Sequence, residues 1–205
     1  MVFRQHGELF AIYCHTLIAL DIKHLCYNKT KKEGVYMSET ISCRQTLAVT
    51  SHRVLTSDLN EHETVYGGAL LALLDGTASI SASRFARSQC VTAALDQVNF
   101  IKPFVLNDSL CIESYVTGHG KRSLEVFVKV IGEHLDTGER FLGMTAFLTF
   151  VVLDKKVTLP ELSAETPEEK SLCADFQKRK AYRRQKIAEQ KKLQASLSLD
   201  FPWYS

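Results

Sequence analysis

The hydrophobic positions of the chain follow two different periods. In residues 67–87, long unbranched and small residues fill every face of the first two helical turns, which is typical of a buried helix. Residues 122–131 instead alternate, with Leu124, Val126, Val128 and Val130 on one face, and this pattern predicts a strand. Further strand-like runs occupy residues 41–55, 91–101, 109–117 and 141–153, and the last is apolar on both faces, as expected of a central strand.

A second helix is expected after Pro160. Thr166 is a suitable N-cap, Pro167 suits the first helical position, and Glu169 completes a capping box. The helix should continue through a basic stretch to about Gln194. The order of elements predicts an α+β domain in which a five-stranded antiparallel sheet wraps around the long apolar helix. One sheet edge and one face would still need cover, so we expect a dimer with a continuous sheet.

The first 36 residues have neither a clear period nor turn logic. They end in Lys-Lys-Glu-Gly at positions 31–34, whose purine-rich codons can contain a bacterial ribosome-binding site before Met37. Our hypothesis is that Met37 is the true start and the leader is translated upstream sequence; a disordered or loosely docked extension is the alternative. The expected organisation is a leader over residues 1–36, the main domain over 37–160, and a C-terminal helix and tail over 161–205.

Composition indicates the class of protein and its setting. Hydrophobic residues make up 45% and charged residues 23% of the chain, and the net charge is +2, which fits a globular protein and indicates no dedicated nucleic-acid binder. The six cysteines are scattered without metal-ligand spacing, which favours free thiols in a reducing cytoplasm. The longest apolar run, residues 9–20, is too short for a membrane span and contains His15. We therefore expect a cytoplasmic protein.

Charge is distributed unevenly along the chain. Residues 178–192 contain eight Lys or Arg against one acid, Glu189. Residues 37–177 are consequently net acidic, at about −6. The basic stretch is interpreted as a solvated helix face, with phosphate contact or oligomer packing as the alternative.

Asp75 is a lone carboxylate in the apolar helix. Its neighbours Leu71, Leu74 and Ala78 argue against a solvated position, and desolvation of a carboxylate is unfavourable unless donors compensate, so Asp75 is a candidate for function. Gly67 and Gly68 would provide unpaired N–H groups at the positive end of the helix dipole, where a developing oxyanion can be stabilised. Asp75 lies roughly 11 Å along the axis from that end. The acid and these donors should therefore come from opposite protomers.

A motif connects these residues. It comprises Asp58-x-Asn60, the aromatic Tyr66 before Gly67-Gly68, and an acid eight residues after the first glycine. With residues 98–108 and 121–126, it resembles the signature of the hotdog-fold acyl-CoA thioesterases, most closely their bacterial and cytosolic long-chain acyl-CoA hydrolases. The resemblance covers roughly residues 41–190. One departure is Glu63-Thr64, where family members often have Gly-Asn, a change that could alter loop shape or acyl preference.

The resemblance implies hydrolysis of acyl-CoA thioesters to fatty acid and coenzyme A. Asp75 would act as general base or as nucleophile, Gly67-Gly68 would polarise the carbonyl, and Asn60 would orient water or the carbonyl. Asn60 as a simple turn residue is the alternative, and His62 is better interpreted as a plain loop histidine. Substrate phosphates are expected near Lys121, Arg122, Ser123, Arg84 and Arg87, although a solvated surface charge explains each of the basic residues equally well.

No metal or redox cofactor is implied, because coenzyme A is part of the substrate. The expected partners are acyl-CoA and further copies of the chain, as a dimer at least, with a trimer of dimers as the larger candidate. A dehydratase or isomerase would need a His and Glu pairing that is not visible. A non-catalytic acyl-CoA-binding regulator is the other alternative, but residues 1–40 do not resemble a helix-turn-helix and Asp75 argues for chemistry.

Overall fold

The computed structural model describes residues 40–200, so the predictions about residues 1–36 lie outside the described part. Five antiparallel strands form the main sheet in the order β2-β4-β5-β6-β3. Their bounds are Ala48–Arg53 for β2, Cys90–Phe100 for β3, Asp108–His119 for β4, Ser123–His134 for β5 and Arg140–Val152 for β6. A short parallel pair, β1 (Thr40–Ser42) with β7 (Glu161–Ser163), stands apart from it.

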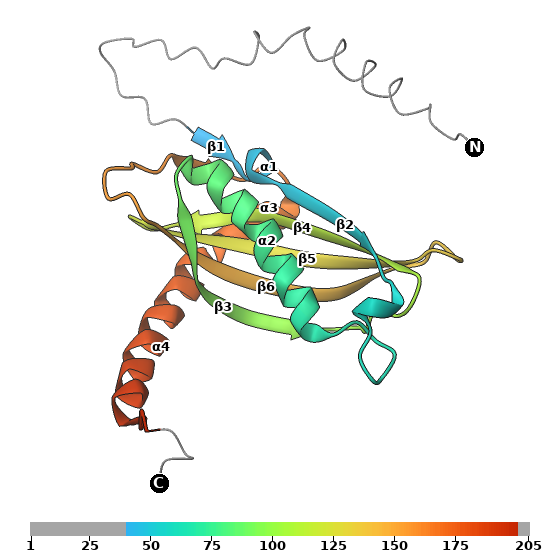
Figure 1. The fold of residues 1–205 in the computed structure, drawn as a ribbon. Coiled ribbons are helices and arrows are strands. Elements are labelled where there is room, and N and C mark those ends of the chain that lie inside the picture. Colours follow the sequence, from blue (N-terminus) through green and yellow to red (C-terminus); the bar gives the residue numbers. More distant parts are fainter. Residues whose placement is uncertain (1–39, 201–205) are drawn as a thin grey trace, which may run out of the picture. The chain divides into compact units, whose positions relative to one another are not determined.

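The long helix α2 (Gly67–Ala86) lies across one face of this sheet (Figure 1). Its buried side chains include Leu70, Leu74, Ala78 and Ala82, which recur every four residues and therefore form one stripe. They meet Leu124, Val126, Val128 and Val130 of β5, all fully or almost fully buried in the same core. The predicted helix, the alternation in β5 and the hotdog architecture are thus confirmed.

The expectation that α2 is buried on every side is wrong for the single chain. Ala72, Gly76 and Ile80 lie on its outward face and are exposed, Ile80 by 44%. A sheet can cover only one side of a helix, so an apolar sequence on the other side indicates a second covering surface. Within residues 40–200, no helix is both long and apolar enough to cross a membrane.

Residues 41–55 do not form the single strand expected. A one-turn helix, α1 (Cys43–Thr46), separates β1 from β2. Ser42 Oγ accepts the Gln45 N–H at 3.3 Å, and Gln45 Oε1 accepts the Ser42 N–H at 2.7 Å. This capping box satisfies the turn's free donors locally, and its Ser-x-x-Gln signature is visible in the sequence beneath the β-branched residues.

The C-terminal segment contains more elements than one helix and a tail. Helix α3 (Pro167–Ala174) starts as predicted, with Thr166 as cap and Glu169 closing the capping box. It ends before Asp175, and a separate helix, α4 (Phe176–Ser196), follows. Phe176 packs directly on β4, where a Cβ at Gly118 would lie 2.3 Å from its ring. Helix α3 and the start of α4 thus lie over the sheet face opposite α2, and the rest of α4 extends away from the sheet (Figure 1).

The basic stretch is not simply a solvated helix face. The side chains of Arg179 and Arg183 are only 11% and 14% exposed, and both bind the fully buried carboxylate of Glu125 on β5. Arg179 also lies over the ring of Phe147 on β6, 4.3 Å from its centroid. These two arginines therefore fasten α4 to the sheet.

Candidate active site

The first turn of α2 presents free hydrogen-bond donors. The helix begins at Gly67 after Tyr66, whose side chain forms no capping bond. The Tyr66 carbonyl accepts the N–H groups of Ala69 and Leu70. The hydrogen bonds of the described residues include no acceptor for the N–H of Gly67 or Gly68. Two donors at the positive end of a 20-residue helix are consequently available to a negative or polarised oxygen.

Two aromatic rings flank these glycines. A Cβ at Gly68 would lie 2.4 Å from Cε1 of Tyr66, so any side chain there would collide with the ring. A Cβ at Gly67 would lie 3.6 Å from Cζ of Phe100, an ordinary contact. A side chain at Gly68 would therefore displace the Tyr66 ring, which is 62% exposed, whereas the Phe100 ring lines the pocket at the helix start.

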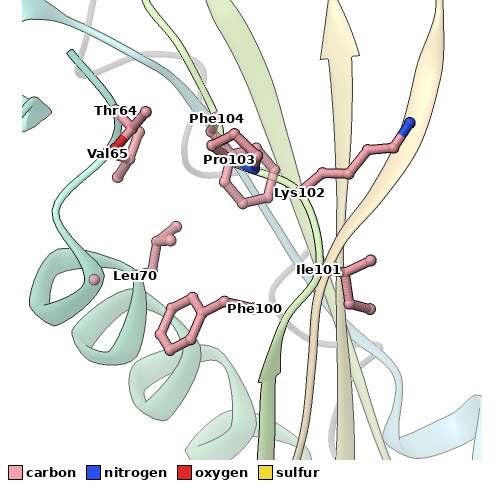
Figure 2. Close-up of a pocket in the computed structure, with 9 residues that line it drawn as sticks. Thr64, Val65, Leu70, Phe100, Ile101, Lys102, Pro103 and Phe104 are labelled. Carbon is pink, nitrogen blue, oxygen red and sulfur yellow. The ribbon is translucent and has the colours of Figure 1, made fainter. Parts of the chain in front are cut away.

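An apolar pocket of about 380 Å³ opens at the same end of the helix. Figure 2 shows Phe100 and Leu70 beside the first turn, Thr64 and Val65 on the opposite wall, and the Lys102 amine directed away from the pocket. Its lining consists of Thr64, Val65, Gly67, Leu70, Phe100, Ile101, Lys102, Pro103 and Phe104. The pocket thus places largely hydrophobic walls next to the helix N–H groups.

The loop before α2 is organised by Asn60. Its Oδ1 accepts three hydrogen bonds, from the His62 N–H at 2.9 Å and from the N–H and Oγ1 of Thr64, each at 3.2 Å. Glu63 between them has a φ of 59°, in the left-handed region. Its position helps to explain the glycine that family members often have there. His62 is an exposed loop residue whose ring nitrogen lies 3.5 Å from Glu61.

Asp58 connects this loop to the start of the helix. Its carboxylate accepts the Leu55 N–H at 2.7 Å and contacts His52 Nε2 at 2.8 Å. These contacts, the Leu55 N–H foremost, lower the pKa of Asp58. The Asp58 carbonyl accepts the N–H of Tyr66 at 2.9 Å. Asp58 therefore holds the loop in place next to the start of α2, and Asn60 of the same motif provides the side-chain amide.

Asp75 lies about two turns further along α2 and is half-buried rather than enclosed. Its Oδ1 accepts a 2.7 Å hydrogen bond from Thr92 Oγ1 on β3. Asp75 does not line the pocket at the helix start, about 11 Å away along the axis. A single chain thus keeps the acid and the N–H donors apart. Thr92 was missed from the sequence because only the packing of β3 beside α2 reveals it.

The phosphate-binding candidates lie elsewhere. Lys121 is exposed in the turn between β4 and β5, next to Ser123 at the start of β5. Arg122 is already bonded through Nη2 to the carbonyls of Val152 at 2.8 Å and Leu153 at 3.2 Å. His119, at the same turn, stacks against Phe85 with ring centroids 5.4 Å apart. This turn therefore adjoins the C-terminal end of α2, opposite Gly67 and Gly68.

The remaining two cations also belong to the C-terminal end of α2. Arg84 donates from Nη1 to the carbonyl of Leu47, at the end of α1. Arg87 terminates the helix in a left-handed conformation with a φ of 49°. Arg84, Arg87 and Lys121 thus all lie near the C-terminal end of α2, whereas Asn60 lies in the loop before its N-terminal end.

Comparison with known proteins gives consistent results. Residues 62–138 match the model of the Thioesterase superfamily. An uncharacterized acyl-CoA thioester hydrolase of Bacillus subtilis is 46% identical over 168 residues, which cover 80% of this chain and 98% of that protein. The crystal structure of an acyl-CoA hydrolase from Bacillus cereus superposes with a TM-score of 0.74 at 39% identity, covering 77% of this chain and 98% of that one.

Two other solved structures concern assembly and ligands. A hexameric acyl-CoA thioesterase without ligand has a TM-score of 0.70 and 34% identity, covering 73% of this chain and 98% of that one. An acyl-CoA hydrolase from Staphylococcus aureus, in complex with butyryl coenzyme A and coenzyme A, has a TM-score of 0.71 and 30% identity, covering 76% and 96%. That hydrolase was also solved with an Asn, an Asp fifteen residues later and a Thr seventeen residues after the Asp each replaced by Ala.

Proposed function

Because this chain belongs to the thioesterase superfamily and, within it, to the acyl-CoA thioester hydrolases, we propose that each of its active sites combines the helix start of one protomer with Asp75 of another. The enzyme hydrolyses acyl-CoA to a free fatty acid and coenzyme A. The observation that carries the proposal is the separation, within one chain, of the donors at Gly67-Gly68 from the carboxylate of Asp75 by about 11 Å.

The donor half of the site polarises the thioester carbonyl. Negative charge develops on the carbonyl oxygen during attack, and the N–H groups of Gly67 and Gly68 are aimed outward along the helix dipole to receive it. The side-chain amide of Asn60 contributes a further N–H donor, since its oxygen is occupied within the loop. The aromatic and aliphatic walls of the neighbouring pocket provide apolar surface beside these donors.

The acid half of the site supplies the attacking group. Thr92 occupies Oδ1 of Asp75, which leaves Oδ2 to accept a proton from the hydrolytic water as that water attacks the carbonyl. Direct attack by the carboxylate, with a mixed anhydride that water then opens, uses the same oxygen. In either route the C–S bond breaks and the thiolate of coenzyme A takes up a proton. The proposed steps need no metal or redox cofactor.

The residue spacing supports these assignments. In the S. aureus hydrolase the substituted Asn, Asp and Thr are separated by fifteen and then seventeen residues. Asn60, Asp75 and Thr92 have the same residue types and the same two separations. Residues chosen for substitution in that enzyme thus correspond to the two halves described for this one.

The second protomer joins along β3. This strand is an edge of the main sheet and exposes Val91 by 44% and Leu95 by 41%, which is unfavourable for an edge left in water. Pairing there extends the sheet, and it covers the outward face of α2 around Ile80 with apolar surface. The functional unit is a dimer at least, and a trimer of dimers would agree with the hexameric relative.

Coenzyme A also needs contacts for its phosphates. We assign these first to Lys121 and Arg87, whose side chains form no hydrogen bond among residues 40–200, with Ser123 two positions from Lys121. Arg84 and Arg122 are second candidates, because each guanidinium already donates to a backbone carbonyl. The thiols of Cys43, Cys90, Cys111 and Cys173 are free, and a reducing cytoplasm is the location that suits them. The alternative function, acyl-CoA binding without turnover, is not supported, because the relatives of this chain are named as hydrolases.

Mixing two inactive variants tests the shared site. We expect Asp75→Asn and Asn60→Ala each to lower kcat by about 100-fold or more, because the first removes the attacking group's carboxylate and the second removes a donor to the developing oxyanion. In co-expressed mixtures, half of the dimers are mixed and one of their two sites is intact, so activity should recover to about a quarter of wild type.

A mixture of Asp75→Asn with Asp75→Ala is the matched control and should show no recovery. If the first mixture also stays inactive while mass spectrometry detects mixed dimers, the acid and the donors act within one chain and the shared site is disproved. Full activity of either single variant would remove that residue from the site.

A further inference from the structure

We propose that Thr64 is a positioning residue for thioester hydrolysis, which acts by fixing the direction in which the Asn60 amide faces. The inference rests on the proposed function, because it matters only if Asn60 donates to the thioester carbonyl. It starts from an unusual feature of the loop. Three donors converge on one side-chain oxygen, and Thr64 supplies two of them.

The three contacts determine which end of the amide is the oxygen. The N–H groups of His62 and Thr64 can only donate, so the Asn60 atom they meet must be the acceptor. Rotation of the amide by 180° would set its own N–H groups against these donors and replace three hydrogen bonds by donor–donor contacts. The Nδ2 group is therefore held on the opposite side, and it has no acceptor among the hydrogen bonds of the described residues.

Thr64 is itself held firmly in place. Its carbonyl accepts the Asn60 N–H at 2.8 Å, so the two residues bond in both directions. An isolated bridge joins it to Val105 on the segment between β3 and β4. The Thr64 side chain lines the pocket that adjoins Gly67 (Figure 2). The hydroxyl of Thr64 is thus a fixed donor at the boundary between the loop and the substrate space.

The Thr64 hydroxyl restricts a motion of the Asn60 amide that the two backbone N–H donors still allow. The N–H groups of His62 and Thr64 determine which end of the amide is the oxygen, and both belong to the backbone on either side of Glu63. Thr64 Oγ1 reaches the same oxygen by a route independent of the backbone, at 3.2 Å. Its removal would let the amide swing, so Nδ2 would meet the carbonyl in a smaller fraction of turnovers.

The test compares Thr64→Val with Thr64→Ser in the full-length enzyme, in the wild-type and the Asn60→Ala backgrounds. Val keeps the shape and removes the hydroxyl, whereas Ser keeps the hydroxyl. We expect Thr64→Val to lower kcat about three- to tenfold with KM unchanged, the effect of one hydrogen bond. Thr64→Ser should restore most of kcat. In the Asn60→Ala background Thr64→Val should cause no further loss, since Thr64 acts only through that amide.

Thr50→Val is the matched control. It removes a hydroxyl that contacts Thr77 of α2 at 2.9 Å, away from the loop, so it should lower the melting temperature while leaving kcat unchanged. The inference is overturned if Thr64→Val keeps the wild-type kcat, or if it loses the same factor in both backgrounds, as a purely structural role would. Failure of the proposed function is seen separately, as full activity of Asn60→Ala or of Asp75→Asn.

Discussion

The two faces of the main sheet hold their carboxylates in different environments. On the face covered by α3 and α4, the carboxylate of Glu125 is fully buried and accepts hydrogen bonds from Thr117, Arg179 and Arg183. Glu168 nearby is bound by Lys129 and Tyr115. On the face covered by α2, Asp75 is only half-buried, and Thr92 is the one side chain among residues 40–200 that binds it.

This difference assigns stability to the face beneath α3 and α4 and catalysis to the side of α2. The charges beneath α4 are paired with one another, so they hold the C-terminal helices in place. The α2 side instead keeps groups that can bind a substrate, namely the N–H groups of Gly67 and Gly68, the Asn60 amide N–H₂ group and one oxygen of Asp75. Substitutions beneath α4 should therefore change the free energy of unfolding, whereas substitutions of the Asn60 and Asp75 side chains should change kcat.

Removal of Glu125 should have the largest effect on stability. Glu125→Ala leaves Arg179 and Arg183 without their buried partner, so we expect the free energy of unfolding to fall by about 3–5 kcal/mol. Urea denaturation measures this change. Glu133→Ala, which breaks the more exposed pair with Arg140 at 3.6 Å, is the control and should cost about 0.5 kcal/mol or less. A loss of kcat in folded Glu125→Ala would show that the two faces are coupled.

Local patterns explain which parts of the fold were predictable. The alternation of Leu124 to Val130 and the capping residues around Pro167 act within a few positions of one another, so the sequence determines β5 and the start of α3 directly. The short helix α1 was overlooked because β-branched neighbours outweighed the box formed by Ser42 and Gln45. The signal for α1 is thus local, but it competes with the strand propensity of the residues around it.

Long-range pairings explain the rest. The alternation already puts Glu125 on the face opposite Leu124, but its partner Arg179 lies 54 positions away, and no local period connects them. In the site, Asn60, Gly67-Gly68 and Asp75 follow from one compact motif. Thr92 does not, because its contact with Asp75 depends on how β3 packs beside α2. Sequence thus indicated the reactive groups, while their supporting contacts required the structure.

Glu63→Gly, in the loop before α2, should increase stability, in contrast to the loss expected for Glu125→Ala. Glu63 has a φ of 59°, a conformation that costs a non-glycine residue about 1–2 kcal/mol, of which the extra freedom of glycine in the unfolded chain cancels a part. We expect a gain in the free energy of unfolding of about 0.5–1 kcal/mol, measured by urea denaturation. Glu61→Gly, in the same exposed loop without a positive φ, is the control and should not stabilise. Equal effects of both changes would mean that Glu63 carries no strain.

The smallest effect should depend on pH. Partial burial alone would raise the pKa of Glu168, but hydrogen bonds from Lys129 and Tyr115 outweigh it and hold the pKa below its ordinary value. A carboxyl group with a lowered pKa stabilises the fold above its unfolded pKa, near 4.5, and loses this contribution as pH falls through the folded value. Because its side chain is 48% exposed, Glu168→Gln should cost only about 0.5 kcal/mol at pH 7.

The urea-denaturation curves of wild type and Glu168→Gln should therefore converge as the pH is lowered from 4.5 through the lowered pKa of Glu168. Glu161→Gln, an exposed change on β7, provides the control and should match wild type at every pH. A gap that persists in acid would mean that Glu168 stabilises through packing rather than charge. If Glu168→Gln also leaves kcat at pH 7 unchanged, the division between the two faces extends to a carboxylate that is only partly covered. Charge state, and not burial alone, would then determine which residues stabilise the fold.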